Sequence, residues 1–393
     1  MNDNSKPGKI RVGILGCAEI AKKNARALFL SENCLLVAIA SRTQEKVDAF
    51  IKDIGLPLEI KAHSTYEALL ADDLDAVYIP LPTTLHAMWV AKAAAAGKSI
   101  LIEKPVALCM EDMDAMVSVC AANNVVLMDG LMFQHHDRLG RLLRELADPF
   151  TGPVTSIHSA FSFHGDAAFF ADNIRVSADG DPLGALGDLG WYTVRIALLA
   201  MSAKAAGGSP ISPLACSVLP ASVSGVCLRW AGADKTVPLD VFCTLTFAGL
   251  DGDGGGAPRI VRFENSFNSA FRQHFEVVCL GLNGRGDKVL TCSDFVIPST
   301  HTQASFKIES MPPAFPGIDH ACRILTKVET ITVSDCSQEV NMFECFGGLV
   351  AARKARSGAS VEERAWSCFM VNTQRILNAL LVSMKEGGRE VIL

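Results

Sequence analysis

The stretch Ile100-Leu101-Ile102-Glu103-Lys104-Pro105 decides the fold that the sequence predicts. Three apolar residues run directly into a carboxylate, an amine and a proline. Such a short, uniformly apolar run is typical of a strand buried on both faces of a parallel sheet. Pro105 ends the strand, so Lys104 is expected at its carboxyl end, where open α/β sheets bind ligands. The alternative is that Lys104 is a solvated loop cation paired with Glu103.

The segments around this stretch alternate between strands and helices. We expect strands at 10–15, 35–40, 76–79 and 125–128, a helix that follows the turn at 16–21 and continues to about residue 30, and helices at 66–70, 87–96 and 111–123. Strand–helix alternation requires a parallel sheet with helices on both of its faces. Residues 1–150 are therefore predicted to form a Rossmann dinucleotide-binding domain.

A glycine turn follows the first expected strand. Residues 16–21 read Gly-Cys-Ala-Glu-Ile-Ala, a G-x-A-x-x-A variant of the dinucleotide-binding pattern. Gly16 can form the tight turn, and the start of the next helix can bind a pyrophosphate. Ala18 places a methyl group where a glycine normally allows close approach. An ordinary strand-to-helix turn would look the same; the functional reading makes Gly16, Cys17, Ala18, Glu19 and Ile20 cofactor contacts.

The second expected strand ends in a hydroxyl and two cations. Ser41 and Arg42 follow it directly, and Lys46 comes four residues later. A cofactor with a free ribose 2′-hydroxyl calls for an acid near this point. The residues found here suit a 2′-phosphate through charge-assisted hydrogen bonds. They indicate NADP as the cofactor, with NAD as the alternative, unless they only begin a basic helix.

A proline-rich loop follows the strand at 76–79. Pro80, Leu81 and Pro82 make it stiff and poor in backbone donors, which suits contact with an apolar ring. His86 opens the next helix. We expect these four residues, together with Glu103 and Lys104, to contact the cofactor, although His86 also fits a simple helix start.

The pattern changes after about residue 150. An alternating strand at 154–163 is followed by a helix that ends near 201 and then by strands near 223–230, 239–247, 260–267 and 275–280. Glycine, proline and aspartate turns separate them, as in an antiparallel sheet. Residues 250–258 are glycine-rich and fit a hairpin tip. Residues 151–393 are predicted to form an α+β domain, whose two last helices, at about 339–356 and 361–385, can pack back on the first domain.

The length, composition and net charge of the chain argue against several classes of protein. Its 393 residues suffice for two domains, and 49% hydrophobic with 20% charged residues is typical of a folded soluble protein. A net charge of −6 argues against nucleic acid and anionic membranes as partners. The 13 cysteines form no CxxC pair and indicate reduced thiols, which fits the cytoplasm. No run is long and apolar enough to span a bilayer, no metal site is expected, and a small molecule is the expected ligand.

Taken together, these motifs resemble the glucose–fructose oxidoreductase / inositol dehydrogenase (Gfo/Idh/MocA) family. The stretches that carry the resemblance are Val12–Ala18, Ala40–Arg42, Tyr78–Pro82 with His86, Glu103–Pro105, Asp172–Arg175 and Gly184–Tyr192. The last two are similar to the branch with NADP-dependent D-xylose dehydrogenase and dimeric dihydrodiol dehydrogenase. Within that branch, the chain looks closest to uncharacterised plant-type oxidoreductases.

The resemblance implies both structure and roles. It implies a Rossmann domain followed by a domain built on a large open, mainly antiparallel sheet, through which a homodimer forms. It implies that Lys104 is the catalytic lysine, with Asp188 and Tyr192 beside it, in a cleft between the domains. It also implies substrate contacts at Arg175, Phe133 and Phe163. Relatives tend to carry a glutamate, a tyrosine and an arginine where this chain has Asp129, Phe133 and Gln134, so their substrates do not transfer directly.

The expected chemistry is hydride exchange between nicotinamide and a secondary alcohol or carbonyl of a small sugar, polyol or cyclic diol. Lys104 and Tyr192 can share the proton, because a cation near a phenol favours the phenolate. Asp188, four residues before Tyr192 and on the same helical face, can orient Lys104. The alternatives are a helix N-cap for Asp188 and a packing aromatic for Tyr192.

Two other functions remain open at this stage. One is a nicotinamide-binding sensor or regulator without turnover. The other is a glycosidase that uses a bound nicotinamide cofactor for a transient oxidation. The presence of Lys104, Asp188 and Tyr192 together favours the oxidoreductase.

Overall fold

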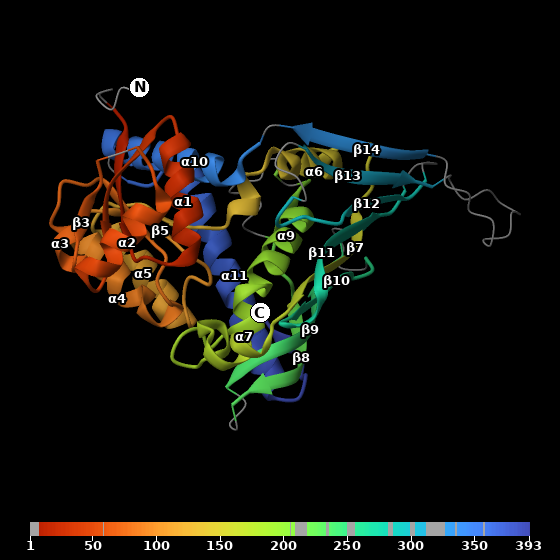
Figure 1. The fold of residues 1–393 in the computed structure, drawn as a ribbon. Coiled ribbons are helices and arrows are strands. Elements are labelled where there is room, and N and C mark those ends of the chain that lie inside the picture. Colours follow the sequence, from red (N-terminus) through yellow and green to blue (C-terminus); the bar gives the residue numbers. More distant parts are fainter. Residues whose placement is uncertain are drawn as a thin grey trace, which may run out of the picture. The chain divides into compact units, whose positions relative to one another are not determined.

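The computed structural model describes residues 8–57, 59–204, 206–208, 218–232, 236–249, 256–281, 286–298, 303–311, 327–334, 336–356 and 358–393. They form two compact units, shown in Figure 1. Unit 1 comprises Met1–His135 and Ser337–Val371, and unit 2 comprises His136–Cys336 and Asn372–Leu393. The sequence predicted a domain boundary at residue 150 and two last helices that can pack back on the first domain; by contacts, the chain changes unit near 135 and returns to unit 1 for Ser337–Val371.

Unit 1 contains a six-stranded parallel sheet with the order β3-β2-β1-β4-β5-β6. The strands are β1 Ile10–Leu15, β2 Cys34–Ala40, β3 Lys61–His63, β4 Ala76–Ile79, β5 Ser99–Ile102 and β6 Leu127–Asp129. Every residue of β4 and β5 is buried, because both faces of a parallel sheet are covered. The strand order reverses at the β1–β4 pair, which confirms the predicted Rossmann part of the fold.

Helices connect these strands. They are α1 Glu19–Leu30, α2 Gln44–Ile54, α3 Tyr66–Leu70, α4 His86–Ala95 and α5 Met110–Ala122, with the 3-10 turn η1 Thr83–Leu85. The 3-10 turn η2 Met132–His135 follows β6, and α10 Gln338–Ala355 comes much later in the chain. The helix α2 begins after Thr43, whose hydroxyl accepts a hydrogen bond from the Lys46 amide. Distant in sequence, α10 contacts α1, β1 and β2. The first residues of α11, Val361–Lys385, complete the unit.

Unit 2 contains a nine-stranded sheet with the order β14-β13-β12-β11-β7-β10-β9-β8-β15. The strands are β7 Val154–His164, β8 Ser222–Ala231, β9 Val237–Phe247, β10 Arg259–Ser266, β11 Asn268–Cys279, β12 Lys288–Cys292, β13 Gln303–Ser310, β14 Lys327–Ser334 and β15 Val391–Ile392. β7 pairs in parallel with β10 and antiparallel with β11, and the other pairs are antiparallel. The predicted mainly antiparallel sheet is therefore confirmed.

One face of this sheet is covered and the other is open. The helices of unit 2 are α6 Asp137–Ala147, α7 Ala167–Asp172, α8 Gly184–Asp188, α9 Gly190–Ser202 and the rest of α11, with the 3-10 turn η3 Ile174–Val176. Figure 1 shows α9 running along the sheet, and it contacts β7 and β10. On the open face, Val226 and Phe242 remain 47% exposed. The glycine-rich hairpin expected at 250–258 lies largely outside the described residues.

Candidate active site

Four segments meet at the carboxyl edge of the unit 1 sheet. They follow β1, β2, β4 and β5, which are neighbours in the order β2-β1-β4-β5. Their residues are Gly16–Ile20, Ser41–Lys46, Pro80–His86 and Glu103–Lys104. The parallel sheet thus brings the residues predicted to contact a cofactor to one edge, where such sheets bind ligands.

The turn after β1 requires glycine. Gly16 has φ +130°, and a Cβ atom there would lie 2.9 Å from Cδ2 of Leu81. Cys17 and Ala18 lead into α1. Ala18 is the N-cap of this helix and makes no side-chain capping hydrogen bond. The first amide groups of α1 are therefore not capped by a side chain and can donate to an anion. Glu19 is exposed and pairs with Lys22 at 2.9 Å.

The end of β2 presents its two cations to solvent. Arg42 and Lys46 are exposed, whereas Ser41 is only 2% exposed and hydrogen-bonds to Cys17. Burial raises the pKa of the Cys17 thiol, so the thiol stays protonated. Tyr66, which the sequence did not single out, lies close enough to Arg42 to interact electrostatically, while burial raises the pKa of its phenol. Phosphate contacts at this strand end are therefore open to Arg42 and Lys46 more than to Ser41.

The loop after β4 is tied to the segment after β5 through His86. This histidine is 1% exposed, and burial lowers its pKa. Its Nδ1 lies 3.0 Å from the carbonyl oxygen of Val106, and its Nε2 lies 2.8 Å from that of Leu81. The ring nitrogens therefore face the chain's own backbone. Leu81 and Pro82 are half-buried and Pro80 is buried.

The Glu103 side chain is held by a buried chain of hydrogen bonds. Tyr78 in β4 donates from its hydroxyl to Glu103 Oε1 at 2.6 Å, and Asn24 in α1 donates to the Tyr78 oxygen at 2.6 Å. The Lys104 amide lies 3.4 Å from Glu103 Oε2. Neither Asn24 nor Tyr78 was predicted from the sequence as a site residue. The available signal was a polar residue in the apolar stripe of α1, where its neighbours Ala21, Ala25 and Leu28 are buried.

In unit 2, Asp188 forms an ion pair with Arg175. Arg175 Nε lies 3.1 Å from Asp188 Oδ1, and the aspartate side chain is 8% exposed. Asp188 ends α8, and the N-cap of α9 is Leu189, so the alternative that Asp188 caps the helix is wrong. The backbone of Leu189 stays in the right-handed helical region, which places Asp188 and Tyr192 one turn apart.

Aromatic residues surround Tyr192 and Phe163. Tyr192 is 5% exposed and meets Phe161 edge to face, with centroids 5.3 Å apart. Phe163 packs against Phe169 and Phe267. The predicted site residues are divided between the two units. Unit 2 contains Asp188, Tyr192, Arg175 and Phe163, and unit 1 contains Lys104 and Phe133, which is 1% exposed.

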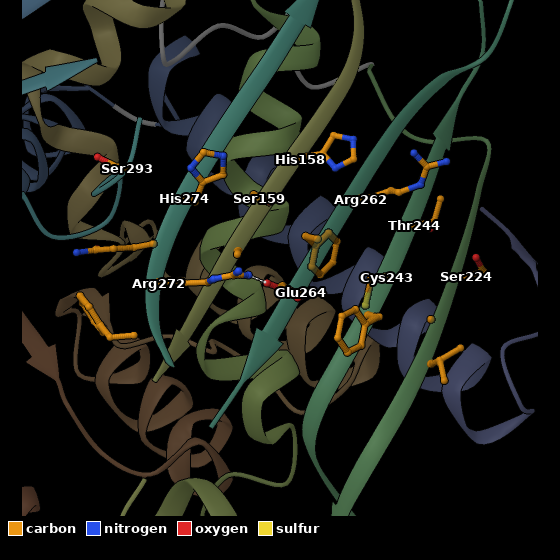
Figure 2. A pocket seen from close by; sticks show the side chains of 17 residues that line it. His158, Ser159, Ser224, Cys243, Thr244, Arg262, Glu264, Arg272, His274 and Ser293 are labelled. Carbon is orange, nitrogen blue, oxygen red and sulfur yellow. Dashed lines mark hydrogen bonds and ion pairs between the residues drawn. The ribbon is translucent and has the colours of Figure 1, made fainter. Parts of the chain in front are cut away.

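The open face of the unit 2 sheet carries a separate hollow of about 900 Å³. Figure 2 shows His158, Arg262, Glu264, Arg272 and His274 along it. Tyr192 contacts Phe161, which alternates with His158 along β7 and so points to the other face. This hollow and Tyr192 thus lie on opposite faces of one sheet.

Two features are absent from the part of the chain that the structure describes. None of its helices is long and apolar enough to cross a membrane. None of its His, Cys, Asp and Glu residues gather into a group of three that could hold a metal ion.

Comparison with known proteins identifies the family that the sheet region of unit 1 resembles. Residues 10–131 match the model of the GFO_IDH_MocA oxidoreductase family, with an NAD-binding Rossmann fold. This part of the chain is therefore similar to the Gfo/Idh/MocA family. The predicted resemblance is thereby confirmed, and the matched residues contain the turn after β1, the cations after β2, the β4 loop and Lys104.

Relatives match about half of the chain. D-xylose 1-dehydrogenase (NADP(+)) 2 of Haloferax volcanii is 39% identical over 188 residues, which cover 48% of this chain and 56% of that protein. A dTDP-3,4-didehydro-2,6-dideoxy-alpha-D-glucose 3-reductase of Actinomadura kijaniata is 35% identical, over 52% of this chain and 59% of that protein. The chain thus spans less than two thirds of the length of these Gfo/Idh/MocA-type relatives.

Solved structures extend the likeness of fold to nearly the whole chain. KijD10, a 3-ketoreductase from Actinomadura kijaniata in complex with NADP and TDP-benzene, has a TM-score of 0.73. The match is 24% identical and covers 95% of this chain and 98% of KijD10. An aldose-aldose oxidoreductase from Caulobacter crescentus is 18% identical, with a TM-score of 0.70, and covers 98% of this chain and 100% of that one. Both units therefore have the fold of the solved Gfo/Idh/MocA oxidoreductases.

Proposed function

We propose that this protein is an NADP(H)-dependent oxidoreductase. It would transfer hydride between nicotinamide and a secondary alcohol or carbonyl of a small sugar, polyol or cyclic diol. The observation that carries the proposal is the placement of Lys104 after β5, at the same sheet edge as the Gly16 turn and the exposed Arg42 and Lys46. The named activities of the relatives, D-xylose dehydrogenase and dTDP-sugar 3-reductase, support it.

The residues at this edge fit a dinucleotide phosphate. Gly16 leaves a close approach that a Cβ atom would obstruct, and α1 begins without a side-chain cap. Arg42 and Lys46 would bind a 2′-phosphate, so NADP is the preferred cofactor. NAD stays as the alternative, since GenD2, 19% identical with a TM-score of 0.68, was solved with NAD.

When bound, nicotinamide supplies or accepts the hydride, and the protein manages the proton. We assign the proton at the substrate oxygen to Lys104 and Tyr192. Glu103, anchored by Tyr78, fixes the backbone beside Lys104. Asp188 balances the charge of Arg175 and is assigned a supporting role in the same reaction. Arg175, Phe133 and Phe163 are the proposed substrate contacts.

We also propose a homodimer formed through the open face of the unit 2 sheet. This face mixes both signs of charge: Arg262 and Arg272 lie near Glu264, and Arg272 pairs with Glu264. Exposed apolar side chains, Phe242 and Phe271, lie among them. A second copy turned by a twofold axis presents the same pattern in reverse, so it can pair the charges and cover the apolar groups. The expected cytoplasmic location stays a prediction.

One assay separates the three candidate functions. The protein is mixed with NADP or NAD and a panel of aldoses, polyols, cyclic diols, their keto forms and aryl glycosides, and the absorbance of reduced nicotinamide is followed. A net change supports the oxidoreductase. Tight cofactor binding without any change would identify a sensor, and sugar release without net redox change a glycosidase; either result would overturn the proposal.

A further inference from the structure

His86 joins the two loops that bound the proposed reaction site in unit 1. It begins α4, immediately after the loop that follows β4. Its ring is 1% exposed, with Nδ1 3.0 Å from the Val106 carbonyl oxygen and Nε2 2.8 Å from the Leu81 carbonyl oxygen. Val106 lies two residues after Lys104, and Leu81 packs against the turn at Gly16.

The chemistry of this contact limits what His86 can hold. Carbonyl oxygens only accept hydrogen bonds, and a neutral imidazole carries one N–H. Burial lowers the pKa of His86, which favours the neutral ring. One tautomer therefore donates to Val106 and the other to Leu81. Each tautomer therefore donates a hydrogen bond to one loop, and the carbonyl oxygen of the other loop faces a ring nitrogen that cannot donate.

We propose that His86 is a positioning residue whose two tautomers hold, in turn, the Lys104 segment through Val106 and the cofactor loop through Leu81. The Lys104 segment is already anchored on its other side, since Tyr78 and Asn24 hold Glu103. His86 supplies the second anchor, so the backbone of Lys104 is fixed from both ends. The catalytic part of this inference rests on the proposed function, whereas the tie between the loops does not.

Two substitutions separate the two bonds. An asparagine amide can occupy the place of Nδ1, so His86→Asn keeps a donor for Val106 and loses the one for Leu81. A glutamine amide can reach the place of Nε2, so His86→Gln keeps the donor for Leu81 and loses the one for Val106. His86→Phe keeps a ring but cannot donate from either ring position. Met88→Ala, on the same helix and 47% exposed at the wild-type side chain, is the matched control.

The first readout is hydrogen exchange of the protein without cofactor, which needs no activity. We expect His86→Asn to raise exchange in peptides covering 79–88 and to leave 103–109 protected, and His86→Gln to do the reverse. We expect His86→Phe to raise both and Met88→Ala neither. Equal deprotection of both peptides in the Asn and Gln variants, or wild-type exchange in both, would overturn the proposal.

The second readout is a split between affinity and turnover. Losing one buried hydrogen bond should weaken NADP binding about fivefold to a hundredfold in His86→Asn with turnover largely kept. His86→Gln should lower turnover by a similar factor with NADP affinity kept. Parallel losses that track the melting temperature would mean a purely structural histidine and refute the positioning role. A wild-type protein that binds NADP without turning over any panel compound would refute the proposed function instead, and the exchange data would still decide the tie between the loops.

Discussion

The two sheets of this protein bury their strands in different ways, and this determines where each can carry function. In unit 1, β4 and β5 are buried at every position. In unit 2, β9 alternates between buried and accessible residues along its second half. A strand covered on both faces can present reactive side chains only where it ends. A strand covered on one face can present them along its length.

The site residues follow this difference. Gly16, Arg42, Pro80 and Lys104 all come just after strands of the parallel sheet. In unit 2, Phe161 and Phe163 come from within β7, and Tyr192 comes from the helix that covers that face. We infer that unit 1 supplies backbone-defined contacts to the cofactor, while unit 2 supplies side chains that define the substrate.

The largest expected effect concerns one residue from each region. Removing an acid/base group slows turnover by ~10²–10⁴-fold. We therefore expect Lys104→Met and Tyr192→Phe each to lose turnover by this factor, with NADP affinity close to that of the wild type. If the two side chains move one proton together, the double variant should be little slower than the slower single variant.

The control for this comparison is Lys52→Met, an exposed lysine in α2. It should keep full turnover. Near-normal turnover in Lys104→Met would end the lysine assignment. Losses that multiply in the double variant would leave both residues important but reject the shared proton.

The next effect separates the covered face of the unit 2 sheet from the open one. Phe275 in β11 is 0% exposed, and truncating a buried phenylalanine costs about 3–5 kcal/mol. We expect Phe275→Ala to lower the free energy of unfolding, measured by urea titration, by this amount. Phe242→Ala, at a side chain that is 47% exposed, should instead change the molecular mass measured by light scattering. Equal destabilisation by both, with no change in mass, would contradict an open face used for association.

A smaller effect tests the strand end in unit 1. Losing one charge-assisted contact to a phosphate costs about 1.5–3 kcal/mol, which is roughly tenfold to a hundredfold in affinity. Arg42→Ala should weaken NADP binding by this factor and leave NAD binding nearly unchanged, as measured by calorimetric titration. Arg26→Ala, an exposed arginine of α1, should alter neither. Equal wild-type affinities for NADP and NAD would remove the assignment of Arg42 to a 2′-phosphate.

The smallest effect is the pH dependence of the tie at His86. Its pKa in the folded state lies below the ordinary value, so below about pH 6.5 the unfolded chain binds a proton that the folded protein does not. Its contribution to stability is present above that pH and decreases as the pH falls towards the folded pKa. We expect the slope of unfolding free energy against pH in this window to be shallower in His86→Asn, by at most about 1.4 kcal/mol per pH unit. An unchanged slope would mean that folding does not lower the pKa of His86.

Much of the fold could be predicted because the sequence shows clearly where strands alternate with helices and where strands follow one another. The strand β1 has the expected bounds, Ile10–Leu15, and β5 starts one residue earlier than expected, at Ser99. The apolar run to Ile102 and the break at Pro105 suffice for that inference. The order of the strands in the unit 2 sheet, by contrast, could not be predicted from the sequence. The first strand of that unit, β7, lies in the middle of the sheet between β11 and β10, and such long-range pairing leaves no local signal.

The site was predictable by segment but less so by side chain. The strand ends marked by Gly16, Arg42 and Lys104 follow from the parallel sheet. Whether a side chain at such an end points to solvent or inward depends on its neighbours. Ser41 turns towards Cys17, and His86 turns towards two backbone carbonyls of its own unit. Neither direction is encoded in the local sequence alone, because Ser41 meets Cys17 and His86 meets Val106, partners 20 or more residues away.

The most direct test of the oxidoreductase account is transfer of a labelled hydride. NADPH carrying deuterium at both C4 positions of the nicotinamide is incubated with the protein and the carbonyl compound that the panel identifies as its best substrate. The account predicts that each alcohol formed carries one deuterium on its carbinol carbon, one for each NADPH consumed. An alcohol without deuterium, or no NADPH consumption with any compound of the panel, would contradict it.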